Sequence, residues 1–319
     1  MANYYCQNSS SNIDAANNWN DVPAGGGNVL TWPPASGDNL YANGKTNITI
    51  NVDFNIGTGR LSTEAGPAPG TVGGTFITSA NRVLTCHIYA GSTYGVTVGG
   101  DTTFSITGDI FGGGSTNAGG ITVGSTSTVT HTGNATGGTG TQAPGIWNGS
   151  SSTGTTSGTV TGGSGDTASG IWNRSSGAWS VVNATGGTHI NAPGVKSDGS
   201  AAVTVTGNII STAQCLGVAG RITHSPAAAT NYIQVSSTVK YYPSTNQPDP
   251  KYVYAKAGVY VGDGATSGTL RASTIATAKG SDSNLSAGIL LTGNTVDNVV
   301  GSASGGGGIF MPTAKQIGV

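Results

Sequence analysis

Charged residues are scarce in this chain of 319 residues. Asp, Glu, Lys and Arg make up 8% of it, about a third of the usual quarter. The 12 Lys and Arg nearly balance the 13 Asp and Glu, and they form no basic cluster, which argues against nucleic acid as a partner. Residues that favour helices are missing at helical spacing, and a glycine inside a helix costs about 1 kcal/mol. With 55 glycines, neither a helical bundle nor a coiled coil is expected.

Long apolar runs and paired cysteines are missing as well. No run approaches the ~18 residues that span a bilayer, so no membrane association is expected. No Lys or Arg precedes Lys45 and no apolar segment follows the N-terminus, so we expect no secretory signal and synthesis in a cytoplasm. The cysteines Cys6, Cys86 and Cys215 form no CxxC pair, which favours buried thiols over a disulfide framework.

What the chain does contain is a repeat of short apolar strands. A glycine followed by Ile or Val recurs with a period of about 25 residues that shortens slightly towards the end of the series. A second short strand ending in Thr-Gly lies between successive members, as at Phe104–Gly108. A nearly fixed period of this length indicates a solenoid of stacked repeats. The glycines of the series are Gly95, Gly120, Gly145, Gly170, Gly194 and Gly217.

The period predicts an all-β fold, a right-handed parallel β-helix. At about 3.3 Å per strand residue, one period makes a coil of roughly 80 Å, and eight or nine coils stacked ~4.8 Å apart would make a rod of roughly 40 Å. Glycines would occupy corners that need positive φ or close backbone approach. A flexible glycine-rich linker is disfavoured by the fixed spacing. A sandwich of antiparallel hairpins is disfavoured because two-residue turns such as Asn43-Gly44 are few.

Composition shifts divide the predicted rod into four segments. Residues 1–40, which include Trp19, Trp32, Pro33 and Pro34, are predicted to form an N-terminal cap or attachment segment. Residues 41–230 are predicted to hold the coils. Residues 231–257, rich in Tyr and Pro, are predicted to form an inserted loop or arm, and residues 258–319 the C-terminal coils and cap.

Two tryptophans occupy equivalent places in consecutive repeats. Trp147 and Trp172 lie one period apart, each in the sequence Gly-Ile-Trp-Asn, so they should stack, and strand alternation should turn both indoles outward. Such a pair could pack against a neighbouring subunit or a shell, be covered by Trp179 and a loop, or contact a glycan. Asn148 and Asn173 would then face inward as a hydrogen-bonded ladder.

Other aromatic residues are candidates for attachment to a partner. In the N-terminal segment these are Trp19 and Trp32, and in the predicted arm they are Tyr241, Tyr242, Tyr252 and Tyr254. Aromatic side chains are common anchors of interfaces.

No catalytic, cofactor or metal site is predicted. A glycoside hydrolase needs two facing carboxyl groups, and the Asp residues lie mostly beside glycines, as turn residues do, with Glu64 the only Glu. The four histidines show no ligand spacing, and the adjacent Cys86 and His87 should face opposite sides of a strand. We therefore expect a protein that is not an enzyme and has no cofactor.

The chain resembles the β-helical virion proteins of tailed bacteriophages. The resemblance extends over most of the chain and concerns its general sequence character. It is carried by the opening Met-Ala-Asn-Tyr-Tyr, the stretch Asn-Asn-Trp-Asn, the stretch Leu30-Thr-Trp-Pro-Pro and the segment Gly37–Gly44, which leads into an alternating strand. It implies a location on the virion surface after synthesis in the host cytoplasm. It also implies the major capsid protein or other virion proteins as partners, a homo-oligomer with a trimer favoured, and host glycans as further ligands.

The resemblance implies a structural function, as a capsid decoration protein or head fibre. The alternative is a tail fibre or tailspike that binds, or also cleaves, host polysaccharide. A bacterial adhesin or surface-layer protein is the third hypothesis, and the missing signal peptide disfavours it.

Overall fold

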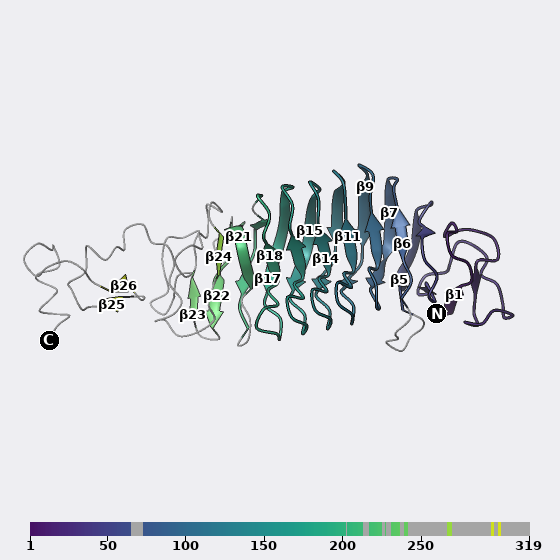
Figure 1. Cartoon of the computed structure of the whole chain (residues 1–319), viewed down its shortest axis with the longest axis horizontal. Coiled ribbons are helices and arrows are strands. Elements are labelled where there is room, and N and C mark those ends of the chain that lie inside the picture. Colours follow the sequence, from purple (N-terminus) through teal and green to yellow (C-terminus); the bar gives the residue numbers. More distant parts are fainter. Residues whose placement is uncertain are drawn as a thin grey trace, which may run out of the picture.

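The strands of the chain stack side by side along one axis and form a rod (Figure 1). The computed structural model describes residues 1–64, 73–201, 203–212, 217–224, 227, 231–236, 239–241, 267–269, 295–296 and 299–300. This part contains strands and no helix, in about seven turns of a β-solenoid. It has no helix that could cross a membrane. The prediction of an all-β parallel β-helix is confirmed.

Three parallel ladders of strands run along the rod. Ladder 1 consists of β4 (Ile48–Thr49), β6 (Phe76–Thr78), β8 (Val96–Val98), β11 (Ile121–Val123), β14 (Ile146–Asn148), β16 (Ile171–Asn173), β18 (Val195–Ser197) and β21 (Val218–His224). Each strand pairs with the equivalent strand of the next coil, and Ile121, Ile146 and Ile171, which lie one predicted period apart in the sequence, form one column. The predicted period is therefore the length of one coil.

Ladders 2 and 3 share several long strands. Ladder 2 contains the N-terminal parts of β5 (Phe54–Ser62), β7 (Arg82–Tyr89), β15 (Thr153–Thr161) and β17 (Trp179–Thr185), together with β9 (Thr103–Thr107), β12 (Thr128–Thr132) and β19 (Val203–Val205). Ladder 3 contains the C-terminal parts of those four strands, with β1 (Asn3–Cys6), β3 (Asn39–Tyr41), β10 (Ile110–Phe111), β13 (Ala135–Thr136), β20 (Ile209–Ile210) and β22 (Ile233–Ser236).

Glycine is required at the bend between ladders 2 and 3. Gly108 and Gly133 have φ values of 139° and 148°, which side chains rarely adopt. A Cβ on Gly108 would also lie 2.0 Å from the carbonyl oxygen of Cys86, in the preceding coil. The high glycine content thus follows from tight stacking of one corner on the next.

The hydrophobic core runs along the axis of the rod. In each strand every second side chain points into this core. In ladder 1 the inward column contains Phe76, Val96, Ile121, Ile146 and Ile171, each at most 1% exposed. Complete burial of such a side chain contributes about 1.5–3 kcal/mol. Cys6 and Cys86 are buried free thiols, as expected, and burial raises the pKa of the Cys86 thiol to about 12. Cys215 lies outside the described residues.

The N-terminal segment lies at one end of the rod, where its strands pair with one another and with β3 (Figure 1). β1 pairs in parallel with β3 and antiparallel with β2 (Trp19–Asn20). Trp19 is 2% exposed, stacks on Phe76 at 6.4 Å between ring centroids, and donates its indole N–H to the carbonyl oxygen of Ile13. The segment therefore fills the first coil with an aromatic side chain.

At the other end of the described rod, antiparallel pairs replace the parallel ladders. Ile233 of β22 still continues ladder 3, just past the predicted boundary at 231, and β22 then pairs with β23 (Val239–Tyr241). β21 pairs antiparallel with β24 (Ser267–Thr269). The remaining described strands, β25 (Thr295–Val296) and β26 (Val299–Val300), pair with each other.

Candidate functional site

Trp147 and Trp172 stack on the outer side of ladder 1, as the repeat spacing predicts. Their ring centroids lie 5.5 Å apart with planes inclined by 14°, while the preceding residues Ile146 and Ile171 are fully buried. Tyr94 meets Trp147 edge-on at 5.7 Å. We call these three aromatic residues, with the cations described next, the tryptophan stripe.

Two cations lie against the stacked indoles. The Arg174 guanidinium carbon is 5.9 Å from the ring centroid of Trp147 and 5.2 Å from that of Trp172, and Lys196 Nζ is 4.2 Å from the centroid of Trp172. These distances are those of cation–π contacts. Lys196 also pairs with Asp198 at 3.4 Å, and Asp198 accepts a hydrogen bond from the indole N–H of Trp172 at 2.9 Å.

The indoles of Trp147 and Trp172 differ in their exposure to solvent. Trp172 is 5% exposed, because Trp147, Lys196 and Asp198 surround it, whereas Trp147 is half-buried and Arg174 is exposed. A ligand on this surface would therefore meet Trp147 and Arg174 first. Trp172 contributes by holding them in place.

Trp179 does not cover the stripe, which corrects one of the three interpretations of the tryptophan pair. Its side chain is 1% exposed and turns into the core at ladder 2, where it lies over Gly154 of the preceding coil. A Cβ on Gly154 would lie 2.6 Å from the indole, so the glycine provides the space that the indole fills. The indole N–H donates to the hydroxyl of Thr156 at 3.3 Å.

The asparagine ladder beneath the stripe is confirmed. Asn148 and Asn173 are fully buried, and Asn148 Nδ2 donates to Asn173 Oδ1 at 3.0 Å and to the hydroxyl of Ser175 at 2.8 Å. Asn173 Nδ2 donates to the carbonyl oxygen of Gly177. The ladder joins two coils and ties down the turn that follows β16.

The predicted attachment residues fall into three groups. Trp19 is a core residue, so its interpretation as an exposed anchor is wrong: the cap has to bury its largest side chain to close the coil. Trp32 is half-buried and packs edge-on against Phe54 at 5.7 Å. Tyr241 ends β23, and Tyr242, Tyr252 and Tyr254 lie outside the described residues.

A second aromatic column, which the sequence did not reveal, follows the outward positions of ladder 3, where Tyr5 and Tyr41 are buried and Tyr89 and Phe111 are half-buried. Tyr5 stacks on Tyr41 at 5.4 Å, and Tyr89 stacks on Phe111 at 4.4 Å. The Arg60 guanidinium carbon lies 4.4 Å from the ring centroid of Tyr89. Tyr89 and Phe111 pair across a coil that is shorter than the repeat, so a search at the fixed period misses the column.

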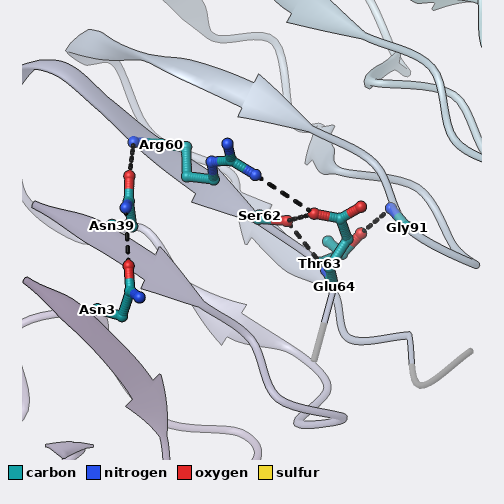
Figure 2. Close-up of polar contacts among 7 residues, drawn as sticks. All are labelled: Asn3, Asn39, Arg60, Ser62, Thr63, Glu64 and Gly91. Atoms are coloured by element: carbon teal, nitrogen blue, oxygen red, sulfur yellow. Dashed lines mark hydrogen bonds and ion pairs between the residues drawn. The ribbon is translucent and has the colours of Figure 1, made fainter. Parts of the chain in front are cut away.

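Polar contacts join β5, in ladder 3, to β3 and β1 of the N-terminal segment (Figure 2). The amide of Asn39 donates to Asn3 Oδ1 at 2.8 Å and accepts a hydrogen bond from the backbone N–H of Arg60 at 3.1 Å. Glu64 lies 3.7 Å from Arg60 and accepts a hydrogen bond from the hydroxyl of Ser62. Burial raises the pKa of the Glu64 carboxyl, and the Ser62 and Arg60 contacts oppose that shift.

Among the other described titratable groups, two His–Asp pairs occur, His87 with Asp109 and His189 with Asp166, each at 3.6 Å. His87 faces outward beside Asp109 at 3.6 Å while Cys86 faces inward, as predicted from alternation. His131 is buried, its Nε2 lies 2.8 Å from the carbonyl oxygen of Gly108, and desolvation lowers its pKa to about 4. Within the described residues, no three His, Cys, Asp or Glu side chains come together as a metal site.

Comparison of the chain with protein-family models, with curated proteins and with solved structures finds no match. The tryptophan stripe and the ladder surfaces are therefore interpreted on their geometry.

Proposed function

We propose that this chain is a structural protein of a virion surface, most simply a capsid decoration protein or head fibre, without catalytic activity. The observation that carries the proposal is the continuous parallel pairing of ladder 1 from β4 to β21, because backbone hydrogen bonding along the axis makes a stiff spacer. The sequence resemblance supports the virion setting.

The capped end is the end we propose for attachment to a shell. Within the described residues, three of the five exposed large hydrophobic side chains belong to this segment: Met1 at 89%, Val22 at 41% and Val29 at 46%. Trp32 adds a half-buried aromatic ring. Apolar and aromatic side chains at a rod tip are suitable anchors for a partner such as a capsid protein.

The test is whether the chain belongs to particles and binds through this end. Virions purified from the producing host should carry the chain at a fixed copy number, visible as projections in density maps. The double variant Val22→Asp/Val29→Asp should lose incorporation at least tenfold. Ile190→Asp, which changes an exposed residue in a loop at mid-rod, should not.

Two results would contradict the proposal. One is recovery of the chain from bacterial surfaces and not from particles, which favours the adhesin. The other is turnover of capsular polysaccharide by the purified chain, which favours a tailspike enzyme. Light scattering of the purified chain tests the trimer that we propose with it.

A receptor-binding tail fibre is the second proposal, and Arg174 is the observation in its favour. Among described residues it has no ion pair, although it is held against two indoles. An aromatic surface with a free cation suits an acidic glycan. Binding of acidic polysaccharides that Trp147→Ala and Arg174→Ala both abolish would support this alternative.

A further inference from the structure

The outer side of ladder 2 is an array of hydroxyl groups. On β9, on β12 and over residues 153–156 of β15 every second residue faces outward, and the residues between them are buried, as the alternating exposure shows. The outward residues form three consecutive rows and are Thr103, Ser105, Thr107, Thr128, Thr130, Thr132, Thr153 and Thr155. The middle column continues to Ser180 and Thr204 in the next two coils.

The rows are in register. Thr128 pairs with Thr103 and Thr153, and Thr130 pairs with Ser105 and Thr155. Strands of a sheet lie about 4.8 Å apart, and residues two apart on a strand are separated by about 6.7 Å. The hydroxyl and methyl groups therefore form a two-dimensional lattice on a rigid surface. Figure 1 shows these strands stacked in the most regular part of the rod.

The hydroxyls of the array are almost unused within the chain. Among the described residues, the recorded side-chain contact between them is that of Thr128 Oγ1 with Thr153 Oγ1, at 3.5 Å. The outward positions of β9 and β12 carry no charge, since His131 of β12 faces the core. The array therefore has donors and acceptors available to a ligand, and no charge to attract an ionic one.

Strand propensity alone does not account for the array. Threonine suits outward strand positions in general, and all three ladders would then be equally rich in it. The outward column of ladder 1 instead passes from Thr122 to Trp147, Trp172 and Lys196. The outward column of ladder 3 begins with aromatic side chains. Further along, ladder 3 has a single outward threonine column, Thr136, Thr161 and Thr185. Ladder 2 differs because it places several hydroxyl columns side by side, which makes the array two-dimensional.

We propose that the outer side of ladder 2 binds ice. A ligand that matches a lattice of hydroxyls must itself repeat in two dimensions, and a crystal plane of ice presents water oxygens in rows at a spacing similar to that of strands in a sheet. Threonine hydroxyls can both donate to and accept from such waters. The methyl groups beside them restrict the adjacent water.

Rigidity is what makes many weak contacts sufficient. A single hydroxyl–water hydrogen bond gains little, because it replaces another one in liquid water. Eight or more groups held at fixed positions by parallel ladders lose little conformational freedom on binding. The array can therefore hold a solid surface although no single residue could.

The full chain should inhibit ice recrystallisation and should concentrate in the ice fraction of a slowly frozen solution. Thr130→Lys places a charge at the centre of the array, and we expect it to reduce both effects at least tenfold. Thr141→Lys is the matched control, since it makes the same change at an exposed loop threonine outside the array. Circular dichroism and thermal unfolding establish that each variant folds. Should Thr130→Lys fail to fold, the double variant Thr130→Ala/Thr155→Ala replaces it.

Several results would overturn the proposal. One is that the folded chain inhibits ice recrystallisation no more than an equal mass of albumin does. Another is that Thr141→Lys reduces this inhibition as much as Thr130→Lys does. Retention on crystalline cellulose that Thr130→Lys abolishes would assign the face to a polysaccharide. A dimer that Thr130→Lys dissociates would assign it to a second copy of the chain. None of these results depends on whether the chain is found on virions.

Discussion

The N-terminal coils and the central coils of the rod have the same ladders but place different residues at equivalent inward and outward positions. We compare residues 73–124 with residues 125–201 at identical positions of the ladders. The inward position of ladder 1 that holds Val98 and Val123 holds Asn148 and Asn173 in the central coils. The inward position of ladder 2 that holds Leu84 and Ile106 holds His131 and Thr156.

The outer surface changes at the same place. The outward column of ladder 1 contains Thr97 and Thr122 in the N-terminal coils, and then Trp147 and Trp172. The N-terminal coils fill most of these positions with apolar side chains, and Thr78 precedes Val98 in the ladder 1 column. The central coils bury polar groups, of which Asn148 Nδ2 and His131 Nε2 form hydrogen bonds between coils, and they carry an aromatic stack outside. The difference shows that one register accommodates polar as well as apolar inward side chains.

The largest expected effect concerns close stacking of backbone in the central coils. A Cβ on Gly162 would lie 1.7 Å from the carbonyl oxygen of Ala192, so Gly162→Ala should separate two coils and destabilise the protein by more than about 4 kcal/mol. Gly99 in the N-terminal coils has no atom within 4 Å of such a Cβ, and Gly99→Ala should change stability by less than about 1 kcal/mol. Urea unfolding measures both, and similar losses would contradict the comparison.

The second prediction concerns pH and His131, which stands where Ile106 stands one coil earlier. Desolvation lowers its pKa in the folded state from 6.5 to about 4, so the unfolded chain binds the proton more readily. Above pH 6.5, His131 is neutral in both states and does not lower the free energy of unfolding. As the pH falls from 6.5 towards 4, protonation of the unfolded chain lowers the free energy of unfolding. The loss is about 3 kcal/mol, at about 1.4 kcal/mol per pKa unit.

His131→Ile should remove this part of the pH dependence. The measurement is the free energy of unfolding between pH 7 and pH 4, for the natural chain and the variant. Identical slopes in the two proteins would show that His131 is not the residue responsible.

The third prediction tests the asparagine ladder. Asn173→Val removes an acceptor of Asn148 Nδ2, the acceptor of the Ser175 hydroxyl and the donor to the Gly177 carbonyl oxygen. It should cost about 2 kcal/mol, because buried polar groups lose hydrogen-bond partners. The double variant Asn148→Val/Asn173→Val recreates the apolar column of Val98 and Val123. Its cost should be smaller than the sum of the two single variants. Strict additivity in chemical unfolding would show that the ladder is not coupled.

The smallest expected effect is that of the stacked indoles. Trp147 and Trp172 should show a coupling of about 1 kcal/mol in a double-mutant cycle with alanine, which is typical of aromatic pairs. Thermal unfolding of the two single variants and the double variant measures it. The same cycle with Thr97 and Thr122, the equivalent pair in the N-terminal coils, should give a coupling close to zero.

The repeat made most of the central coils predictable. The constant repeat spacing and strand alternation together placed Ile146 and Ile171 inside, Trp147 and Trp172 outside, and Asn148 next to Asn173. These are consequences of geometry within a strand and between identical repeats. The aromatic column of ladder 3 escaped prediction because its members come from coils of unequal length.

By itself, the sequence determined the coil length, the direction of most side chains and the scarcity of charge on the surface. Only the tertiary structure decided where Trp19 and Trp179 lie. A pattern of alternation states which way a side chain points, whereas its environment depends on the volume that the next coil leaves free. Gly154 leaves room for Trp179 inside the rod, and the end of the first coil leaves room for Trp19. Both volumes are set by neighbours distant in sequence, which is why two candidate surface residues are core residues.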